Sequence, residues 1–399
     1  MRALRQIVAV SSVNLRNLPQ RATASSVIVG STAGVVAVLI SVLAIGMGFA
    51  RTVAGTGRAD RAIVVSAGAL DEATSSIPRE EVTRIVPAPG IRHSASGDPI
   101  ADTELLVQFQ VPRKANHKPV NVALRGVGKS APALRPEIRL VKGRMFRPGV
   151  HEMIVGGDAE AQYGGLDLGS HVPLAGGEWR VVGVFESLGA SSLDSGALGD
   201  AETVMTAFRH NWFNSVTALL ESPDSLDQLK QALAADPTLH VQVRRESEYF
   251  ASQSRSLNVL LEFVGYFVGG MMAVGAMFAA LNTMYGAVSS RAREIAMLRA
   301  MGFGGAAVLT SVLVEALTLA LAGAIMGSFL AWLLFNGHVT SMSPASTGTQ
   351  TAFALAVTPG LVGLGIVWAF AIGGIGGFFP ALRAARMPVA QVLVGAAAR

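Results

Sequence analysis

The chain contains no cysteine, and it has few charged residues for its length. The absence of cysteine excludes disulfide bonds and thiolate metal ligands. Charged residues make up 15% of the 399 residues, whereas ordinary soluble domains carry about 25%. We therefore expect part of the chain to face something other than water. The net charge of +5 requires no nucleic acid as a partner, because the surplus arginine is confined to short segments beside apolar runs.

The sequence also lacks the usual signals of an enzyme or a metal site. Its seven histidines are scattered, and no G-x-S-x-G elbow indicates a hydrolase. The string Arg125–Ser130 resembles the end of a phosphate-binding loop, but Ala123 stands where the first glycine belongs. Ala131 and Pro132 follow the string instead of a helix that would hold phosphate. We expect a surface turn there, with no catalytic residue, metal or cofactor in this chain.

Long apolar runs are abundant, and four of them exceed the roughly 20 residues that span a bilayer. They are residues 22–50, 258–290, 306–335 and 352–383. The first run is too long for the core of a signal peptide and ends without a clean cleavage site, so we interpret it as a retained anchor. Small residues recur four positions apart in all four runs, which favours close packing of helices in lipid. These pairs are Gly30/Gly34, Gly265/Gly269, Gly323/Gly327 and Gly373/Gly377.

The arginines are distributed unevenly around these runs. Ten of them lie in residues 1–21, in the loop 291–305 and at the C-terminal end, where the only carboxylate is Glu294. The positive-inside rule then predicts that both termini and the 291–305 loop are cytoplasmic. Residues 51–257, in which charges of both signs are mixed, and the uncharged loop 336–351 are predicted to lie on the periplasmic side of a bacterial inner membrane.

The segment 51–257 is long enough to form its own core. Residues 152–155, 171–174 and 178–186 read as strands, and Gly176 and Gly177 form a favoured hairpin turn between the last two. Residues 227–235 read as a short helix, and a polar helical pattern runs from Glu246 into the second apolar run. We therefore predict an α-helical membrane protein with four transmembrane helices and a large α+β extracytoplasmic domain between the first and second.

Two short amphipathic segments, residues 1–21 and 291–303, are predicted to lie beside the membrane. Residues 1–21 are expected to form a helix along its inner surface. Residues 384–399 are expected to form a cytoplasmic tail. In residues 291–303 an apolar stripe of Ile295, Leu298, Met301 and Gly302 faces away from most of the charged residues, which are Arg291, Arg293, Glu294 and Arg299. Such a loop between membrane-length runs indicates a surface that another protein grips. The simpler alternative is a basic loop with incidental order.

Glu315 is a carboxylate about two helical turns inside the third apolar run. Insertion scales put the cost of such a group at about 2.5–3.5 kcal/mol, so Glu315 is expected to face protein or water and not lipid. Asn282 and Thr283 in the second run are candidate polar partners. Three roles remain open: a structural hydrogen bond between helices, the transmission of movement, and a proton relay.

Several motifs together resemble the permease family that includes the macrolide exporter MacB, the lipoprotein-release permease LolC and the cell-division protein FtsX. Two of the motifs flank the last two apolar runs, at Arg293–Gly302 and Pro380–Leu393. The other four lie in the extracytoplasmic segment, at Lys142–Phe146, Glu152–Gly156, Tyr163–Gly169 and Arg180–Val184. The resemblance extends over nearly the whole chain and is weakest in residues 60–140.

The resemblance implies a permease subunit of a mechanotransmission, type VII-like ABC transporter. Two copies of a separate cytoplasmic ATPase would bind ATP, and a second permease copy would complete a homodimer. Residues 291–302 would be the coupling helix. Its ATPase-coupling residues would be Arg291, Arg293, Glu294, Ile295, Leu298, Arg299, Met301 and Gly302, and Glu315 and Asn282 would be intramembrane polar residues.

The resemblance leaves more than one function open. The first is export or extraction of an amphipathic substrate, such as a lipoprotein, glycolipid, peptide or macrolide, with a periplasmic adaptor and an outer-membrane channel as further partners. The second is a transducer that transports nothing and activates a periplasmic cell-wall hydrolase. A sensor of antimicrobial peptides resembles relatives with more than four spans. The length and motifs of the extracytoplasmic segment favour export.

Overall fold

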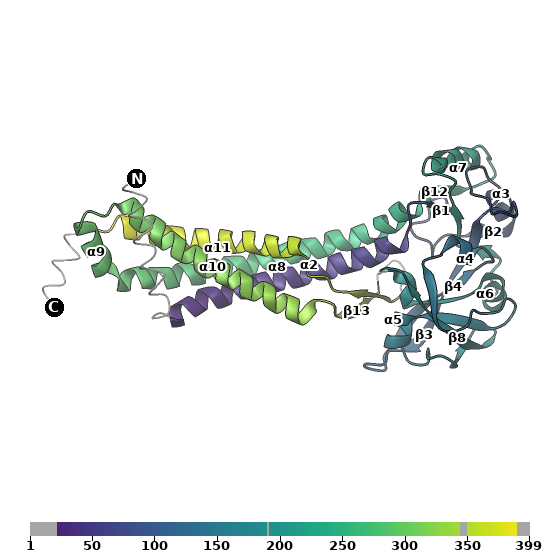
Figure 1. Ribbon diagram of the computed structural model, residues 1–399, viewed down its shortest axis with the longest axis horizontal. Helices are drawn as coiled ribbons and strands as arrows, with labels where there is room; N and C mark the ends of the chain where they lie inside the picture. Colours follow the sequence, from purple (N-terminus) through teal and green to yellow (C-terminus); the bar gives the residue numbers. More distant parts are fainter. Residues whose placement is uncertain (1–21, 190, 344–348, 389–399) are drawn as a thin grey trace. The chain divides into compact units, whose positions relative to one another are not determined.

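The computed structural model describes residues 22–189, 191–343 and 349–388, which form two compact units (Figure 1). The first, which we call the helical unit, comprises residues 22–46, 259–338 and 355–388. The second, the sheet domain, comprises the described residues of 47–258 and 339–354. The amphipathic helix expected in residues 1–21 lies outside the described residues, as does the end of the expected tail.

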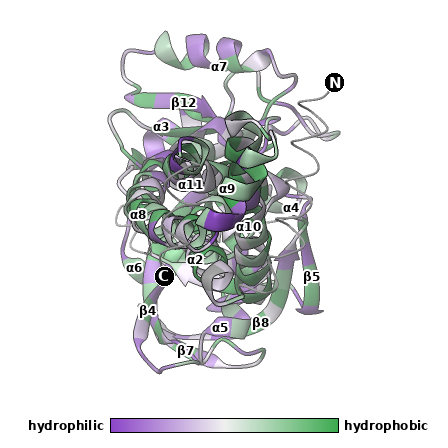
Figure 2. Cartoon of the chain, turned by 90° about the vertical axis from the view of Figure 1, so that its left-hand side faces the viewer, coloured by the Kyte–Doolittle hydropathy of each residue, from purple (hydrophilic) through white to green (hydrophobic). Residues whose placement is uncertain are grey.

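The helical unit is built from long apolar helices, which are largely green in Figure 2. Among the described residues, four helices are long and apolar enough to cross a membrane. They are α2 (Ala22–Thr56), α8 (Glu246–Ser290), α10 (Gly305–Phe335) and α11 (Pro359–Ala385), and a short helix, α9 (Ala292–Ala300), lies between α8 and α10. Helices α2 and α8 contribute residues to both units.

Small residues let these helices pack closely, as the four-residue spacing predicts. A Cβ at Gly377 of α11 would lie 2.5 Å from the Cβ of Ala316 in α10, and one at Gly327 would lie 2.4 Å from the carbonyl oxygen of Ala33 in α2. The pair Gly30/Gly34 differs, because a Cβ at either position meets nothing within 4 Å.

The fourth long helix begins later than the sequence predicts. Residues Thr351–Ala354 form strand β14, which pairs with β13 (Val339–Met342), and α11 starts only at Pro359. Thr358 caps this start through its side chain, which accepts from the N–H of Leu361, and proline is favoured at the first helical position. The expected plain loop 336–351 is therefore part of a hairpin.

The sheet domain contains a ten-stranded sheet among the described residues, in the order β12-β1-β11-β3-β4-β9-β6-β8-β5, with β7 paired to β8. Its strands are β1 (Arg61–Ser66), β3 (Ala101–Pro112), β4 (Pro119–Val127), β5 (Ile138–Gly143), β6 (Glu152–Gly156), β7 (His171–Leu174), β8 (Gly177–Ser187), β9 (Ala197–Asp200), β11 (Ser215–Leu219) and β12 (Val241–Arg245). Strand β2 (Ile77–Pro78) pairs with β10 (Trp212–Phe213). The helices are α3 (Arg79–Ile85), α4 (Ala131–Leu134), α5 (Gly157–Gln162), α6 (Ala201–Phe208), α7 (Ser225–Ala234) and the 3₁₀ helix η2 (Ser192–Ser195).

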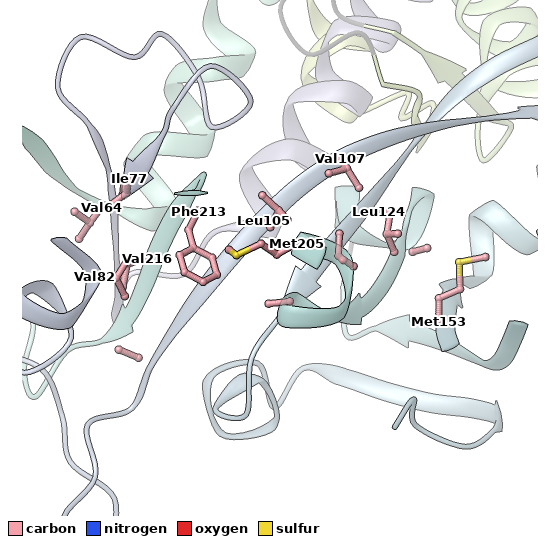
Figure 3. Packing of buried hydrophobic residues seen from close by; sticks show 14 of the residues in the cluster. Val64, Ile77, Val82, Leu105, Val107, Leu124, Met153, Met205, Phe213 and Val216 are labelled. Atoms are coloured by element: carbon pink, nitrogen blue, oxygen red, sulfur yellow. The ribbon is translucent and has the colours of Figure 1, made fainter. Parts of the chain in front are cut away.

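Local sequence signals are confirmed where they were clear. The expected strands correspond to β6, β7 and β8, and the expected short helix corresponds to α7. Gly176 and Gly177 have φ of +81° and +134°, which a hairpin between β7 and β8 requires of glycine. Alternating strand residues such as Leu105 and Val107 are buried in one apolar core that continues to Val216 and Met153 (Figure 3).

The interpretation of the phosphate-loop-like string as a surface turn is wrong for its first three residues, 125–127, which end β4 and are buried. Arg125 belongs to β4, is 7% exposed and pairs with Glu72 and Glu104. A short helix, α4, also follows the string, where none was expected.

Candidate functional site

Helix α9 connects two long helices and is bounded by clear local signals. It begins after Arg291, whose backbone φ is −98°, and it ends before Gly302, whose φ is +93°. At the C-terminal end the N–H of Phe303 donates to the carbonyl oxygen of Leu298 at 3.2 Å. Glycine tolerates this left-handed conformation at the end of a helix, so the chain can turn sharply into α10.

One face of α9 is packed against the helical unit. Ile295 is 7% exposed and Ala296 is 1% exposed, and Leu298 is half-buried. Ile295 lies in an apolar cluster with Met284 and Val288 of α8 and with residues of α10. The predicted apolar stripe is thus correct for Ile295 and Leu298. It is wrong for Met301, which is 69% exposed, and for Gly302, which is also exposed.

The other face of α9 is exposed and mixes charge with methionine. Arg293, Glu294 and Met297 are exposed, as are Ala300 and Met301. Their spacing places them on one side of the helix. Met297 was not among the sequence-predicted residues, although its position four residues before Met301 is a signal that could have identified it. Methionine is common on adaptable binding surfaces because its side chain is flexible and polarizable.

Arg291 does not belong to that exposed face, contrary to expectation. Its side chain is 6% exposed, and its Nη1 donates to the Oε2 of Glu315 at 2.9 Å. The expected partners of Glu315 are therefore wrong. Asn282 is exposed, and the hydroxyl of Thr283 donates to the carbonyl oxygen of Ala279 in its own helix.

Arg299 also has a partner within the helical unit. It is half-buried, and its Nη1 donates to the carbonyl oxygen of Met387 at 2.7 Å, just beyond the end of α11. This bond attaches the last turn of α9 to the segment that follows α11. Of the sequence-predicted arginines, Arg293 is the one whose side chain lies on the exposed face.

A second group of charged residues lies in the sheet domain, at the N-terminal end of α8. Glu246, the first residue of α8, is 0% exposed and accepts from the Nε of Arg61 at 2.5 Å. Arg61 also donates to Glu137 at 2.7 Å, and Arg135 lies 3.3 Å from Glu246. The start of α8 is therefore tied by charge to strand β1 and to the segment after α4.

The same network continues across the sheet to β4. Arg135 donates to Glu104 at 2.7 Å, and Arg125 pairs with both Glu104 and Glu72. Burial alone would raise the pKa of Glu104, but the guanidinium groups of Arg135 and Arg125 outweigh it and hold the pKa well below its usual range. We call the seven residues Arg61, Glu72, Glu104, Arg125, Arg135, Glu137 and Glu246 the charge network.

The β13–β14 hairpin is attached to the rest of the sheet domain by polar and aromatic contacts. Arg113, directly after β3, donates to the Oγ of Ser341 at 2.8 Å and to the Oε1 of Gln350 at 3.0 Å. The N–H of Ala352 donates to the Oγ of Ser195 at 2.7 Å. Phe353 packs edge-on against Phe49 of α2, with ring centroids 5.6 Å apart.

A cavity of about 90 Å³ lies beside this hairpin within the sheet domain. Phe49 and Val53 of α2, Phe250 of α8 and Thr351 contribute to its lining. No cluster of three or more potential metal ligands occurs among the residues that the structure describes.

Comparison with known proteins identifies the family. A model described as the MacB-like periplasmic core domain matches residues 23–236, and one described as the FtsX-like permease C-terminal domain matches residues 266–389. The chain belongs to the MacB/FtsX-type family of ABC transporter permeases. It is accordingly a permease component, with helices able to span a membrane and a domain of the periplasmic type.

Two curated relatives match this chain over part of their length. It is 29% identical over 236 residues to the macrolide export ATP-binding/permease protein MacB of Hyphomonas neptunium. This match covers 56% of this chain and 35% of that protein. It is 22% identical over 235 residues to an uncharacterized ABC transporter permease of Methanocaldococcus jannaschii, covering 58% of each. The chain thus matches only about one-third to three-fifths of the length of these relatives.

Two solved structures resemble part of this chain. The extracellular domain of the noncanonic ABC-type transporter YknZ from Gram-positive bacteria has a TM-score of 0.35 and 16% identity, and the match covers 46% of this chain and 99% of that one. The periplasmic region of MacB from Actinobacillus actinomycetemcomitans has a TM-score of 0.35 and 13% identity, with coverage of 51% and 94%.

Proposed function

We propose that this chain relays ATP-driven movement from a separate cytoplasmic ATPase to its sheet domain, in order to export or extract an amphipathic substrate. The observation that carries the proposal is α9, a short helix between two membrane-length helices whose outer face is free to bind a partner. Arg293, Glu294, Met297 and Met301 supply charge and flexible apolar contact on that face. Such a mixture suits a protein–protein contact.

Continuous helices offer the route for this movement. Helices α2 and α8 each run without a break from the helical unit into the sheet domain. A helix of 45 residues, such as α8, resists compression along its axis because every turn is hydrogen-bonded. In the proposed arrangement, two ATPase subunits act on two permease copies, and each sheet domain moves on the periplasmic side of the membrane.

The sheet domain would act on an amphiphile together with a periplasmic adaptor and an outer-membrane channel. The family membership and the MacB relatives support export over the activation of a cell-wall hydrolase. Affinity purification of the tagged chain in mild detergent, followed by mass spectrometry, distinguishes the two. Recovery of an ATPase with an adaptor supports export, recovery of an ATPase with a cell-wall hydrolase favours the transducer, and no ATPase overturns both.

The role of the exposed α9 face can be tested directly by substitution. Glu294→Lys and Met297→Glu should each lower recovery of the ATPase at least about tenfold, as expected when a central contact is lost. The matched control is Lys230→Glu, a charge reversal at an exposed residue of α7 in the sheet domain. Equal recovery from all variants would refute the assignment of this face.

The absence of cysteine allows a clean test of orientation. A cysteine introduced at exposed Ser96 should react with a membrane-impermeant maleimide in intact spheroplasts. One at Met297, which is 46% exposed, should react only after the cells are opened. The reverse pattern would overturn the proposed topology while leaving the fold unaffected.

A further inference from the structure

Arg291 and Glu315 form an isolated buried ion pair in a mostly uncharged part of the chain. Their side chains are 6% and 5% exposed, and Nη1 lies 2.9 Å from Oε2. Glu315 is the only Asp, Glu, Lys or Arg between Phe303 and Arg383. A buried charge of this kind requires a partner, because an unpaired one in an apolar environment is costly.

The backbone of Arg291 belongs to the junction of two helices. Its N–H donates to the carbonyl oxygen of Ala287 in α8 at 3.3 Å, and its own carbonyl oxygen accepts from Ile295 in α9 at 2.9 Å. Glu315 lies on the third helix, α10. The ion pair therefore attaches the α8–α9 junction to α10 at one point.

The guanidinium group is only partly satisfied by this pairing. Its Nε and Nη2 are buried and have no hydrogen-bond partner among the described residues. A cavity of about 30 Å³ lies beside the ion pair, lined by Arg291, Glu294 and Glu315 with apolar residues of α8, α9 and α10. This volume is enough for about one water molecule. The pair thus has polar contacts still to make and space in which to make them.

We propose that Arg291 is a positioning residue, which joins α9 to α10 through Glu315 so that displacement of α9 also moves α10. Arg291 does not contact the ATPase, because its guanidinium is buried beneath the exposed face of α9. This inference rests on the proposed function for the identity of the force that moves α9. The ion pair itself is independent of it.

Val312 lines the cavity and is 5% exposed. The labelling rate of a single cysteine placed there reports whether the Arg291–Glu315 pair keeps the cavity closed. In the purified full chain, Arg291→Gln and Glu315→Gln should each raise its rate of maleimide labelling at least about tenfold, because a buried charge or its partner is left unpaired. Arg293→Gln, an exposed arginine two positions away, is the matched control and should leave the rate unchanged. Equal rates in all variants would overturn the proposal.

Charge exchange separates a specific pair from general packing. Arg291→Glu combined with Glu315→Arg should restore slow labelling. If that double variant does not fold, Arg291→Lys serves in its place and should restore slow labelling in part. Failure of Arg291→Lys to label more slowly than Arg291→Gln would contradict a role for the charge.

Transmission needs a readout that packing alone would not change. In the complex with the ATPase, a non-hydrolysable ATP analogue should alter labelling at position 312 in the wild type and not in Arg291→Gln. Arg291→Gln should still recover the ATPase, whereas Glu294→Lys should not, and loss of recovery in both would overturn the positioning role. If the wild type recovers no ATPase, the proposed function fails, and the labelling rates without nucleotide still decide the ion pair.

Discussion

The two units both bury charge, but they do so in different ways. In the sheet domain, Arg61, Arg125 and Arg135 each have at least two carboxylate partners. In the helical unit, Arg291 has one carboxylate partner. Buried nitrogens without a hydrogen-bond partner among the described residues occur in both groups: Nε and Nη2 of Arg291, Nη2 of Arg61 and Nη1 of Arg135. The two groups therefore differ in how many carboxylates surround each arginine, and not in whether every remaining hydrogen-bonding group is satisfied.

This difference in connectivity bears on the proposed transmission of movement. The charge network joins several strands and the start of α8, whereas the Arg291–Glu315 pair is a single connection beside a cavity. Under the proposed function, the network would hold the start of α8 in the sheet domain, and the single pair would make α10 follow α9.

Removal of one arginine from the charge network should have the largest effect. Arg61→Ala leaves Glu246 buried and without its closest partner, and we expect a loss of about 3–5 kcal/mol in the free energy of unfolding. Pulse proteolysis of the purified chain measures it. The control is Arg58→Ala, which breaks an exposed pair with Asp60 and should cost at most about 1 kcal/mol. Similar losses would show that the buried network stabilises the fold no more than an exposed ion pair does.

A pH series should reveal the burial of a carboxyl beside the network. Burial, and then the charge of Glu104, raise the pKa of Asp102 to about 7, whereas its ordinary value is 3.8. Between about pH 4 and pH 7, Asp102 therefore keeps its proton in the folded state and has lost it in the unfolded state. The free energy of unfolding falls as pH rises through this range.

The variant Asp102→Asn isolates this effect. Between pH 5 and pH 8, the wild type should lose about 3 kcal/mol of stability relative to the variant. The N–H of Gly128, which donates to Asp102 at 2.9 Å, can still donate to the side-chain oxygen of asparagine. Parallel pH profiles of thermal unfolding for the two proteins would contradict the raised pKa.

The attachment of the β13–β14 hairpin should be weaker than the charge network. Ser195→Ala removes the acceptor for the N–H of Ala352 and should cost about 1–3 kcal/mol locally. Hydrogen exchange measures this as faster exchange within β14. The control is Thr206→Ala, an exposed hydroxyl that donates to a carbonyl oxygen in its own helix. Unchanged exchange in β14 would show that the hairpin is held by other contacts.

The smallest effect is expected at the end of α9, where two glycines form a matched pair. A Cβ at Gly302 or at Gly304 would meet nothing within 4 Å. Gly302 has φ of +93° and Gly304 has φ of −69°, so only Gly302→Ala is strained, by about 1 kcal/mol. Recovery of the ATPase should fall slightly for Gly302→Ala and remain unchanged for Gly304→Ala. Equal behaviour would show that this turn does not position α9.

Much of the fold could be predicted because the signals are local. Apolar runs of membrane length predicted the long helices, and Gly176 with Gly177 predicted the hairpin between β7 and β8. The start of α11 could not be predicted in this way, because Thr351–Ala354 is apolar enough to extend the run. That segment becomes a strand only because Val339–Met342 is available to pair with it.

The candidate site was predictable only in part, for a related reason. Amphipathic spacing identified α9 and the burial of Ile295 and Leu298. It assigned Arg291 to the surface, because a charge in a basic loop ordinarily faces water. The carboxylate that stabilises Arg291 in the interior lies 24 residues away along the chain, on another helix.

The sequence by itself determined the class of protein, the number of apolar helices and the position of the charged loop, because hydropathy and spacing act over a few turns. The tertiary structure decided which charges are buried and with which partners. Arg61 and Glu246 are 185 residues apart in sequence, and each is acceptable in the interior only because folding brings the other within hydrogen-bonding distance. Pairing of that kind depends on the whole fold, so no local pattern could have specified it.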